Sequence, residues 1–388
     1  MKKAGSVALA LALAMGSAHA ADKVKVGFLS TLSGPGGALG VDIEDGFKLA
    51  LKSTGSKLGG LPAELVVVDD QQNPDVAKQA TDRLLKRDKV DLMTGIVFSN
   101  IMLAVGPTIF DSKTFYVSAN AGPSQYAGTQ CNPYFFNVAW QNDNLHEAVG
   151  KHVAEKGFRN VALVAPNYPA GKDALTGFKR YYNGKVADEI YTKLGQLDYA
   201  AELAQIRATR PDAVYIFLPG GMGINFIKQY AAAGLAKDVP LFGPGFSADE
   251  DVIRAAGDAM NGMYNASQWA HDLPNAENRR FVADFEREYG RLPSLYASQG
   301  YDAALLIDAA VRKVKGNLDD KEALRAALAA ADFKSVRGAF KFNRNHYPVQ
   351  DYYLRVVEKD AKGRVTNRTV GTIFKDHADA YANECAMK

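Results

Sequence analysis

Two polar turns carry the side chains best suited to binding chemistry, and each follows a short apolar run. The first spans Phe98 to Asn100, after an apolar run that ends at Gly95. In this turn Ser99 has the residue type and position of an N-cap for a helix expected over Ile101 to Phe110. The second turn spans Ser118 to Ser124. Because both turns lie at the carboxyl ends of expected strands, where open α/β sheets bind ligands, we expect them to hold one small anion.

The N-terminus of the helix expected after Ser99 can stabilise a bound anion. Its first N–H groups have no intrahelical partner and form the positive end of the helix dipole, so a carboxylate can bind there without Lys or Arg. The alternative is that Ser99 only caps its own helix.

Residue groupings typical of enzymes are incomplete in this sequence. The glycines from Gly34 to Gly40, followed by Asp69, resemble a dinucleotide-binding turn, but Leu39 stands where the third glycine belongs and Asp69 lies too far along the chain. A dinucleotide-dependent enzyme is kept as an alternative. His146 is adjacent to Glu147 without a second histidine at metal-ligand spacing. We therefore expect no catalytic group, no metal and no cofactor.

The chain has 388 residues, a length that favours two domains. Its first 20 residues combine Lys2 and Lys3, an apolar stretch from Val7 to Met15 and the small-residue site Ala18 to Ala20, which is the pattern of a secretory signal peptide. A membrane anchor is the alternative, but the stretch is shorter than the roughly 20 residues that span a bilayer. The mature protein should begin at Ala21 or Asp22.

Charge and cysteine content fit an exported protein. Lys and Arg number 46 against 43 Asp and Glu, and removal of the signal peptide brings the balance closer to zero, so nothing indicates a nucleic-acid partner. Cys131 and Cys385 are the two cysteines of the chain. In an oxidising compartment we expect them to form a disulfide, and the alternative is two separate buried thiols.

Expected strands and helices alternate twice along the chain, which predicts two α/β lobes with doubly wound parallel sheets. In the first series strands are expected over 24–29, 65–68, 90–98 and 115–117, with helices over 41–51, 74–86 and 101–110. In the second, strands are expected over 161–165, 213–217 and 241–242, with helices over 143–156, 171–182 and 223–233. Helices over 275–289, 296–314 and 321–330 and a β-rich tail complete the pattern.

The order of these motifs resembles the periplasmic substrate-binding proteins of the branched-chain amino acid type, and among them the subgroup that binds aromatic acids. The resemblance rests on Val24 to Phe28 with Leu32 to Pro35, on Val68 to Asp70 with Asn73-Pro74, on Gly95 to Ser99, on Asn167 to Gly171 and on Leu241 to Gly245. It implies a type I periplasmic binding protein, in which three crossovers join the lobes and ligand binds between them. The expected division is 21–139 plus 271–332 for lobe 1 and 140–270 plus 333–388 for lobe 2.

The same resemblance implies which residues contact the ligand. It places the ligand carboxylate on Ser99 and on Asn120, Ala121 and Gly122. Amino-acid binders of this type carry a glutamate for the ligand's ammonium where this chain has Gly245, and a tyrosine where it has Ala170. Because a buried ammonium without a carboxylate partner is costly, this favours a ligand without an amino group, unless Asp249 or Glu250 takes over. The remaining walls of an apolar chamber are expected from Leu39, Tyr168, Phe217, Pro219 and Tyr296.

The expected function is capture of a small carboxylate, preferably an aromatic or hydrophobic monocarboxylate, in the periplasm. Its partners are then the ligand and an inner-membrane ABC permease, and the protein is expected to be a monomer. Two alternatives share the same fold: a binding protein for branched-chain amino acids, and a ligand sensor for a signalling partner.

Overall fold

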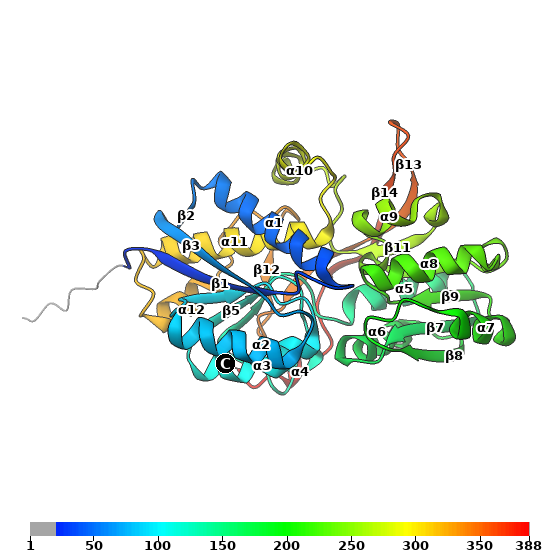
Figure 1. Ribbon diagram of the computed structural model, residues 1–388, viewed down its shortest axis with the longest axis horizontal. Helices are drawn as coiled ribbons and strands as arrows, with labels where there is room; N and C mark the ends of the chain where they lie inside the picture. The colour runs from blue at the N-terminus through cyan, green and yellow to red at the C-terminus, as the bar shows by residue number, and fades with distance from the viewer. Residues whose placement is uncertain (1–20, 388) are drawn as a thin grey trace, which may run out of the picture.

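The computed structural model describes residues 21–387, so the predicted signal peptide lies outside the described residues. Two α/β lobes lie side by side along the long axis of the molecule, and the chain passes between them several times (Figure 1). Within the described part of the chain, no helix has the length and apolar character needed to cross a membrane.

The first lobe is built on a six-stranded sheet in the order β2-β3-β1-β4-β5-β6. Its strands are β1 (Val24–Ser30), β2 (Lys57–Leu58), β3 (Leu61–Asp69), β4 (Leu92–Thr94), β5 (Phe115–Ser118) and β6 (Phe135–Asn137). All neighbours are parallel except β2 and β3. The four strands expected from the sequence are present, and β6 is a further strand that the sequence did not predict.

Helices cover both faces of this sheet, some of them from a later part of the chain. They are α1 (Gly37–Ser53), α2 (Pro74–Asp82) with a π-helical turn (Arg83–Arg87), α3 (Ser99–Asp111), α4 (Ser124–Ala127), α10 (Ala276–Tyr289), α11 (Leu295–Lys313) and α12 (Lys321–Ala329). Helix α1 packs against α11, while α2 packs against α3 on the opposite side of the sheet (Figure 1). Helices α10 to α12 thus pack with the first lobe, although they follow the second lobe in the sequence.

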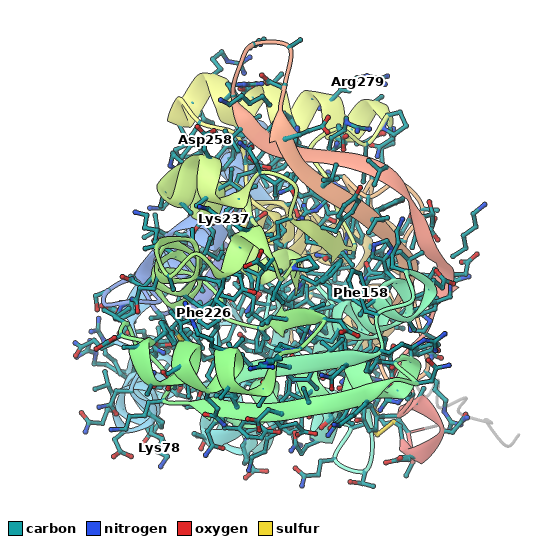
Figure 2. All side chains as sticks on the ribbon, turned by 90° about the vertical axis from the view of Figure 1, so that its right-hand side faces the viewer. Lys78, Phe158, Phe226, Lys237, Asp258 and Arg279 are labelled. Carbon is teal, nitrogen blue, oxygen red and sulfur yellow. A yellow bond between two sulfur atoms is a disulfide. The ribbon has the colours of Figure 1, made fainter. Side chains whose placement is uncertain are left out.

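The second lobe holds a mixed sheet in the order β12-β13-β11-β10-β9-β7-β8, with β14 beside β13. The strands are β7 (Asn160–Pro166), β8 (Lys185–Thr192), β9 (Ala213–Ile216), β10 (Leu241–Pro244), β11 (Tyr264–Ser267), β12 (Lys341–Phe342), β13 (Pro348–Lys359) and β14 (Val365–His377). The helices are α5 (Asn144–Glu155), α6 (Pro169–Tyr181), α7 (Ala200–Thr209), α8 (Gly221–Ala232) and α9 (Glu250–Ala256). Buried side chains such as Phe226 of α8 fill the space between the layers, whereas Lys237 and Asp258 lie exposed on the surface (Figure 2).

One edge of this sheet is antiparallel, beside the parallel strands that the sequence predicts. Strand β13 pairs antiparallel with β11 and with β14. The short connection between β13 and β14 accounts for the second of these pairings, because such a connection can only join antiparallel neighbours. Strand β8 and helices α7 and α9 are further elements that the sequence analysis did not predict.

Strand order reverses once in each lobe, and this is where the fold creates room for a ligand. In the first lobe β1 lies between β3 and β4, and in the second β7 lies between β8 and β9. The turns that follow β4, β7 and β9 therefore face the space between the lobes.

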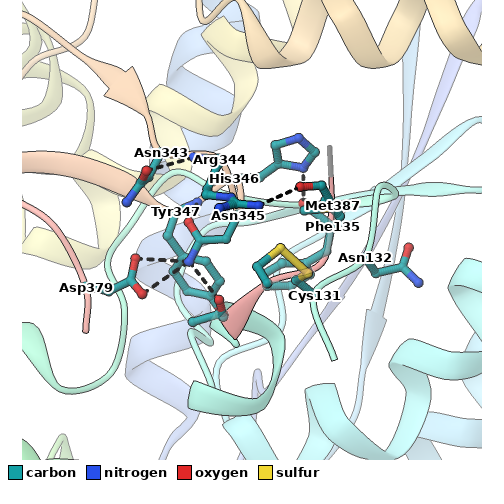
Figure 3. The surroundings of a disulfide bond; sticks show 12 residues. Cys131, Asn132, Phe135, Asn343, Arg344, Asn345, His346, Tyr347, Asp379 and Met387 are labelled. Carbon is teal, nitrogen blue, oxygen red and sulfur yellow. Dashed lines mark hydrogen bonds between the residues drawn. A yellow bond between two sulfur atoms is a disulfide. The ribbon is translucent and has the colours of Figure 1, made fainter. Parts of the chain in front are cut away.

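The C-terminal tail leaves the second lobe after β14 and is bonded to the first. Cys385 forms a disulfide with Cys131, with 5.6 Å between the Cα atoms (Figure 3). Nearby, Asn345 Nδ2 donates to the Asp379 carboxylate at 3.0 Å and to the carbonyl of Ala127 at 2.8 Å. The predicted disulfide is confirmed, and the alternative of separate thiols is wrong.

Candidate functional site

A narrow cavity lies between the lobes. It is lined by Leu39, Val97, Phe98, Ser99, Asn120, Ala121, Trp140, Asn142, His146, Tyr168, Ala170, Phe217, Pro219, Phe246 and Tyr296. Most of these residues follow the carboxyl end of a strand or begin a helix, and both lobes contribute. The fold therefore brings together turns that are far apart in the sequence.

The cavity contains all the ligand-contact residues expected from the sequence except Gly122 and Gly245. Gly122 lies just behind the wall, where its N–H donates to Asn142 Oδ1 at 3.2 Å. A Cβ atom on Gly122 would come within 2.3 Å of the carbonyl oxygen of Trp140, so glycine is required there by close packing.

Gly245 is not among the residues that line the cavity. A Cβ atom at this position would meet Leu295 Cδ2 at 2.9 Å, the guanidinium of Arg355 at 3.0 Å and Ser267 Cβ at 3.1 Å. A side chain built here would thus point first at the buried Arg355. The assignment of Gly245 to the ligand contacts is not supported by this geometry.

Several lining residues were not assigned to the site from the sequence: Val97, Phe98, Trp140, Asn142, His146 and Phe246. From the sequence, His146 is weighed only as a metal ligand or catalytic residue. Asn142 and Trp140 lie between β6 and α5, where the chain passes from the first lobe to the second. Their polar and aromatic side chains in this connecting segment could have indicated a place in the site.

Ser99 is not the N-cap of its helix. Phe98 holds that position with extended backbone angles (φ −100°, ψ 135°), and Ser99 is the first residue of α3. The first intrahelical bond runs from Met102 N to Phe98 O at 3.1 Å, so the three preceding amides have no acceptor one turn back. The hydroxyl oxygen of Ser99 instead accepts a bond from Asn142 Nδ2 at 3.1 Å. The interpretation of Ser99 as only a helix cap is therefore wrong.

The lining residues include no Lys, Arg, Asp or Glu. Burial lowers the pKa of His146 to about 3, and its Nδ1 is hydrogen-bonded to the Tyr215 hydroxyl, so the ring is neutral near pH 7. Burial also raises the pKa of the Tyr168 and Tyr296 phenols. The positive potential in the cavity comes from helix starts, because α1, α3, α6 and α8 all begin beside lining residues.

The two acids proposed to replace a glutamate at position 245 are bound elsewhere. Asp249 accepts a bond from the backbone N–H of Leu295 at 2.8 Å, at the start of α11. Glu250 accepts from the hydroxyl of Thr366 at 2.9 Å and from the side-chain amide of Asn367 at 3.1 Å. Neither carboxylate lines the cavity, so an ammonium group would have no anionic partner among the lining residues.

Aromatic rings form the apolar part of the cavity wall. Tyr168 lies stacked on Phe217 with ring centroids 6.3 Å apart, and meets Phe98 edge-on at 6.2 Å. Trp140 contacts Phe246 edge-on at 4.2 Å. Such a wall provides flat apolar surfaces suited to an aromatic or hydrophobic group.

Comparison with known proteins shows which family has this two-lobed fold. Residues 23–363 match the family model described as periplasmic binding protein. A solute-binding protein of an ABC transporter from R. palustris, solved in complex with benzoate, is 35% identical with a TM-score of 0.89, and the match covers 94% of this chain and 99% of that chain.

Two further relatives extend this comparison. A solute-binding protein from Rhodopseudomonas palustris BisB5 in complex with 3,4-dihydroxybenzoic acid is 30% identical with a TM-score of 0.86, over 93% of this chain and 99% of that chain. The Leu/Ile/Val-binding protein homolog 6 of Brucella melitensis is 28% identical over 386 residues, which cover 97% of this chain and 98% of the relative. All three relatives are described as binding proteins. The chain belongs to the periplasmic binding protein family, with the two-lobed type I fold.

Proposed function

We propose that this protein captures a small aromatic monocarboxylate, such as a benzoate, between its lobes and delivers it to an ABC permease in the inner membrane. The single observation that carries the ligand class is the composition of the cavity: helix starts and aromatic rings surround it, and no charged side chain lines it. An anion is stabilised at such helix starts, whereas an amino group would be buried without a counter-charge.

In this proposal the first lobe holds the carboxylate and the second lobe covers the ring. The amides at the start of α3, the Ser99 hydroxyl and the Asn120-Ala121 turn face the carboxylate. Tyr168, Phe217 and Phe246 of the second lobe pack on the apolar body. Two relatives of at least 30% identity bind benzoate and 3,4-dihydroxybenzoic acid, which supports this ligand class.

Thermal-shift titration of the mature protein tests the ligand class. Benzoate and 4-hydroxybenzoate should raise the melting temperature, because a ligand at 100 times its Kd stabilises the native state by about 2.7 kcal/mol. Leucine and valine at the same concentrations should leave it unchanged. Stabilisation by leucine alone would favour the alternative of a branched-chain amino acid binder, which the Brucella relative's name suggests.

Replacement of Ser99 by alanine tests the anion site. We expect S99A to weaken benzoate binding about 10- to 100-fold, because a hydrogen bond to a charged group contributes roughly 1.5–3 kcal/mol. Isothermal titration calorimetry measures the change. The matched control is S112A at the opposite end of α3, where the hydroxyl bonds only to Ile109 O and Thr114 Oγ1. Equal affinities of S99A and the wild type would refute the role of Ser99.

A further inference from the structure

We propose that Asn142 is a positioning residue that makes the Ser99 hydroxyl a hydrogen-bond donor to the ligand, and that Asp173, which also bonds to Ser124 of the first lobe, holds Asn142 in place. Capture of the anion is thereby coupled to contact between the lobes. The inference rests on the proposed function, since it assumes a carboxylate at Ser99.

Asn142 occupies the segment between β6 of the first lobe and α5 of the second, and its side chain is 4% exposed. Its amide makes three side-chain hydrogen bonds. Nδ2 donates to Ser99 Oγ at 3.1 Å and to Asp173 Oδ2 at 2.9 Å, while Oδ1 accepts from Gly122 N at 3.2 Å. Its own backbone N–H donates to Gly122 O at 2.8 Å.

These bonds fix the orientation of the Asn142 amide. If the amide were rotated by half a turn, its oxygen would face the Asp173 carboxylate and its NH₂ would face the N–H of Gly122, so acceptor would meet acceptor and donor would meet donor. Ser99 Oγ therefore receives a hydrogen from Asn142. A hydroxyl has one hydrogen of its own, and the hydrogen bonds among residues 21–387 include none donated by Ser99 Oγ, so this hydrogen is available to an acceptor in the cavity.

Asp173 belongs to α6 in the second lobe and reaches the first lobe through Ser124. Asp173 Oδ2 accepts from Ser124 N at 3.2 Å and Oδ1 accepts from Ser124 Oγ at 2.8 Å, at the first residue of α4. The Asp173 side chain is 8% exposed, so water competes little for these bonds. The third bond from Asn142 completes the set of donors around this carboxylate. Asp173 therefore links Ser124 of the first lobe to the Asn142 amide that orients Ser99.

A double-mutant cycle on benzoate affinity tests the role of Asn142, using the wild type, S99A, N142A and the double variant. Each single substitution should raise Kd about tenfold or more, and the double variant should be within about twofold of S99A, because Asn142 acts through Ser99. A purely structural role for Asn142 would instead multiply the two effects. Multiplied effects, or wild-type affinity of N142A, would overturn the inference.

The variant D173A tests the role of Asp173 and also serves if N142A does not fold. Alanine at position 173 removes both oxygens that accept from Asn142 and Ser124, so we expect faster benzoate dissociation in stopped-flow experiments, and again little further loss in the S99A background. Asp238 is an exposed acid of the same lobe, so D238A is the matched control and should behave as the wild type. Unchanged dissociation of D173A would overturn the role of Asp173, whereas a wild type that binds no benzoate would overturn the proposed function itself.

Discussion

Gly245 shows how the environment of one residue can differ from what its position in the sequence implies. The sequence predicts that the missing glutamate leaves a ligand ammonium without a counter-charge, yet Gly245 does not line the cavity and a Cβ atom there would meet Leu295 and Arg355. None of the residues that do line the cavity is acidic, so an ammonium would still lack a carboxylate partner among them.

We expect G245A to lower the stability of the protein. The added methyl would lie 2.9–3.1 Å from three surrounding side chains, and overpacking of this kind costs about 1–3 kcal/mol. Urea unfolding measures the loss. G371A in β14 is the matched control, because a Cβ atom there has no neighbour within 4 Å. Equal losses in both variants would show that crowding at position 245 is not the cause.

At the scale of elements, the loop between β12 and β13 connects the second sheet to the first lobe. The His346 ring stacks on Phe136 with centroids 3.9 Å apart, and its Nδ1 is bonded to the carbonyl of Phe135 at 3.0 Å. The backbone N–H of Asn137 donates to His346 O at 3.0 Å. Burial lowers the pKa of His346 to about 4, so the native protein holds this ring neutral.

This pKa predicts a pH-dependent loss of stability. Between pH 6.5 and 4 the unfolded chain binds a proton on His346 that the native protein does not, so the contribution is complete above pH 6.5 and lost as the pH falls. At pH 5 the loss amounts to about 2 kcal/mol. Urea unfolding at pH 7.5 and 5.0 should show a smaller pH effect in H346N, and asparagine tolerates the φ of 61° at this position. The same pH effect in both proteins would contradict the assignment.

At the scale of the whole molecule, the tail forms an additional link between the lobes. Beyond β14, Tyr381 donates a hydrogen bond to Asp143 at 2.8 Å, and Arg180 of the second lobe forms an ion pair with the same carboxylate at 2.8 Å. The disulfide then joins the tail to the first lobe. The end of the chain is therefore bonded to both lobes.

Loss of this disulfide should destabilise the protein strongly. The two cysteines are 254 residues apart, and closing so long a loop removes about 5 kcal/mol of chain entropy from the unfolded state in the simplest model. C131S/C385S should therefore unfold at a lower urea concentration than the oxidised wild type. The reduced wild type should match the double variant. A double variant as stable as the oxidised protein would mean that the tail contacts alone suffice.

Some features of the protein were readable from local sequence. Apolar runs bounded by glycine and proline predicted the alternation of strands and helices. This was possible because the spacing of buried residues within a helix or strand follows from the geometry of that element alone. The turns after β4 and β5 could be placed near a ligand for the same reason, since parallel strands end at one edge of a sheet. Short or half-polar elements such as β6 and β8 were missed, because their burial depends on neighbouring strands.

Ser99 shows which properties of a residue follow from the local sequence and which follow only from the tertiary structure. Its sequence position alone determined that it begins a helix at the edge of a sheet. Only the tertiary structure decided that it is bonded to Asn142 instead of capping α3, and that Trp140, His146 and Phe246 complete the wall. These contacts join segments from both lobes and the crossover, so their geometry is set by how the lobes pack together and has no local pattern in the chain.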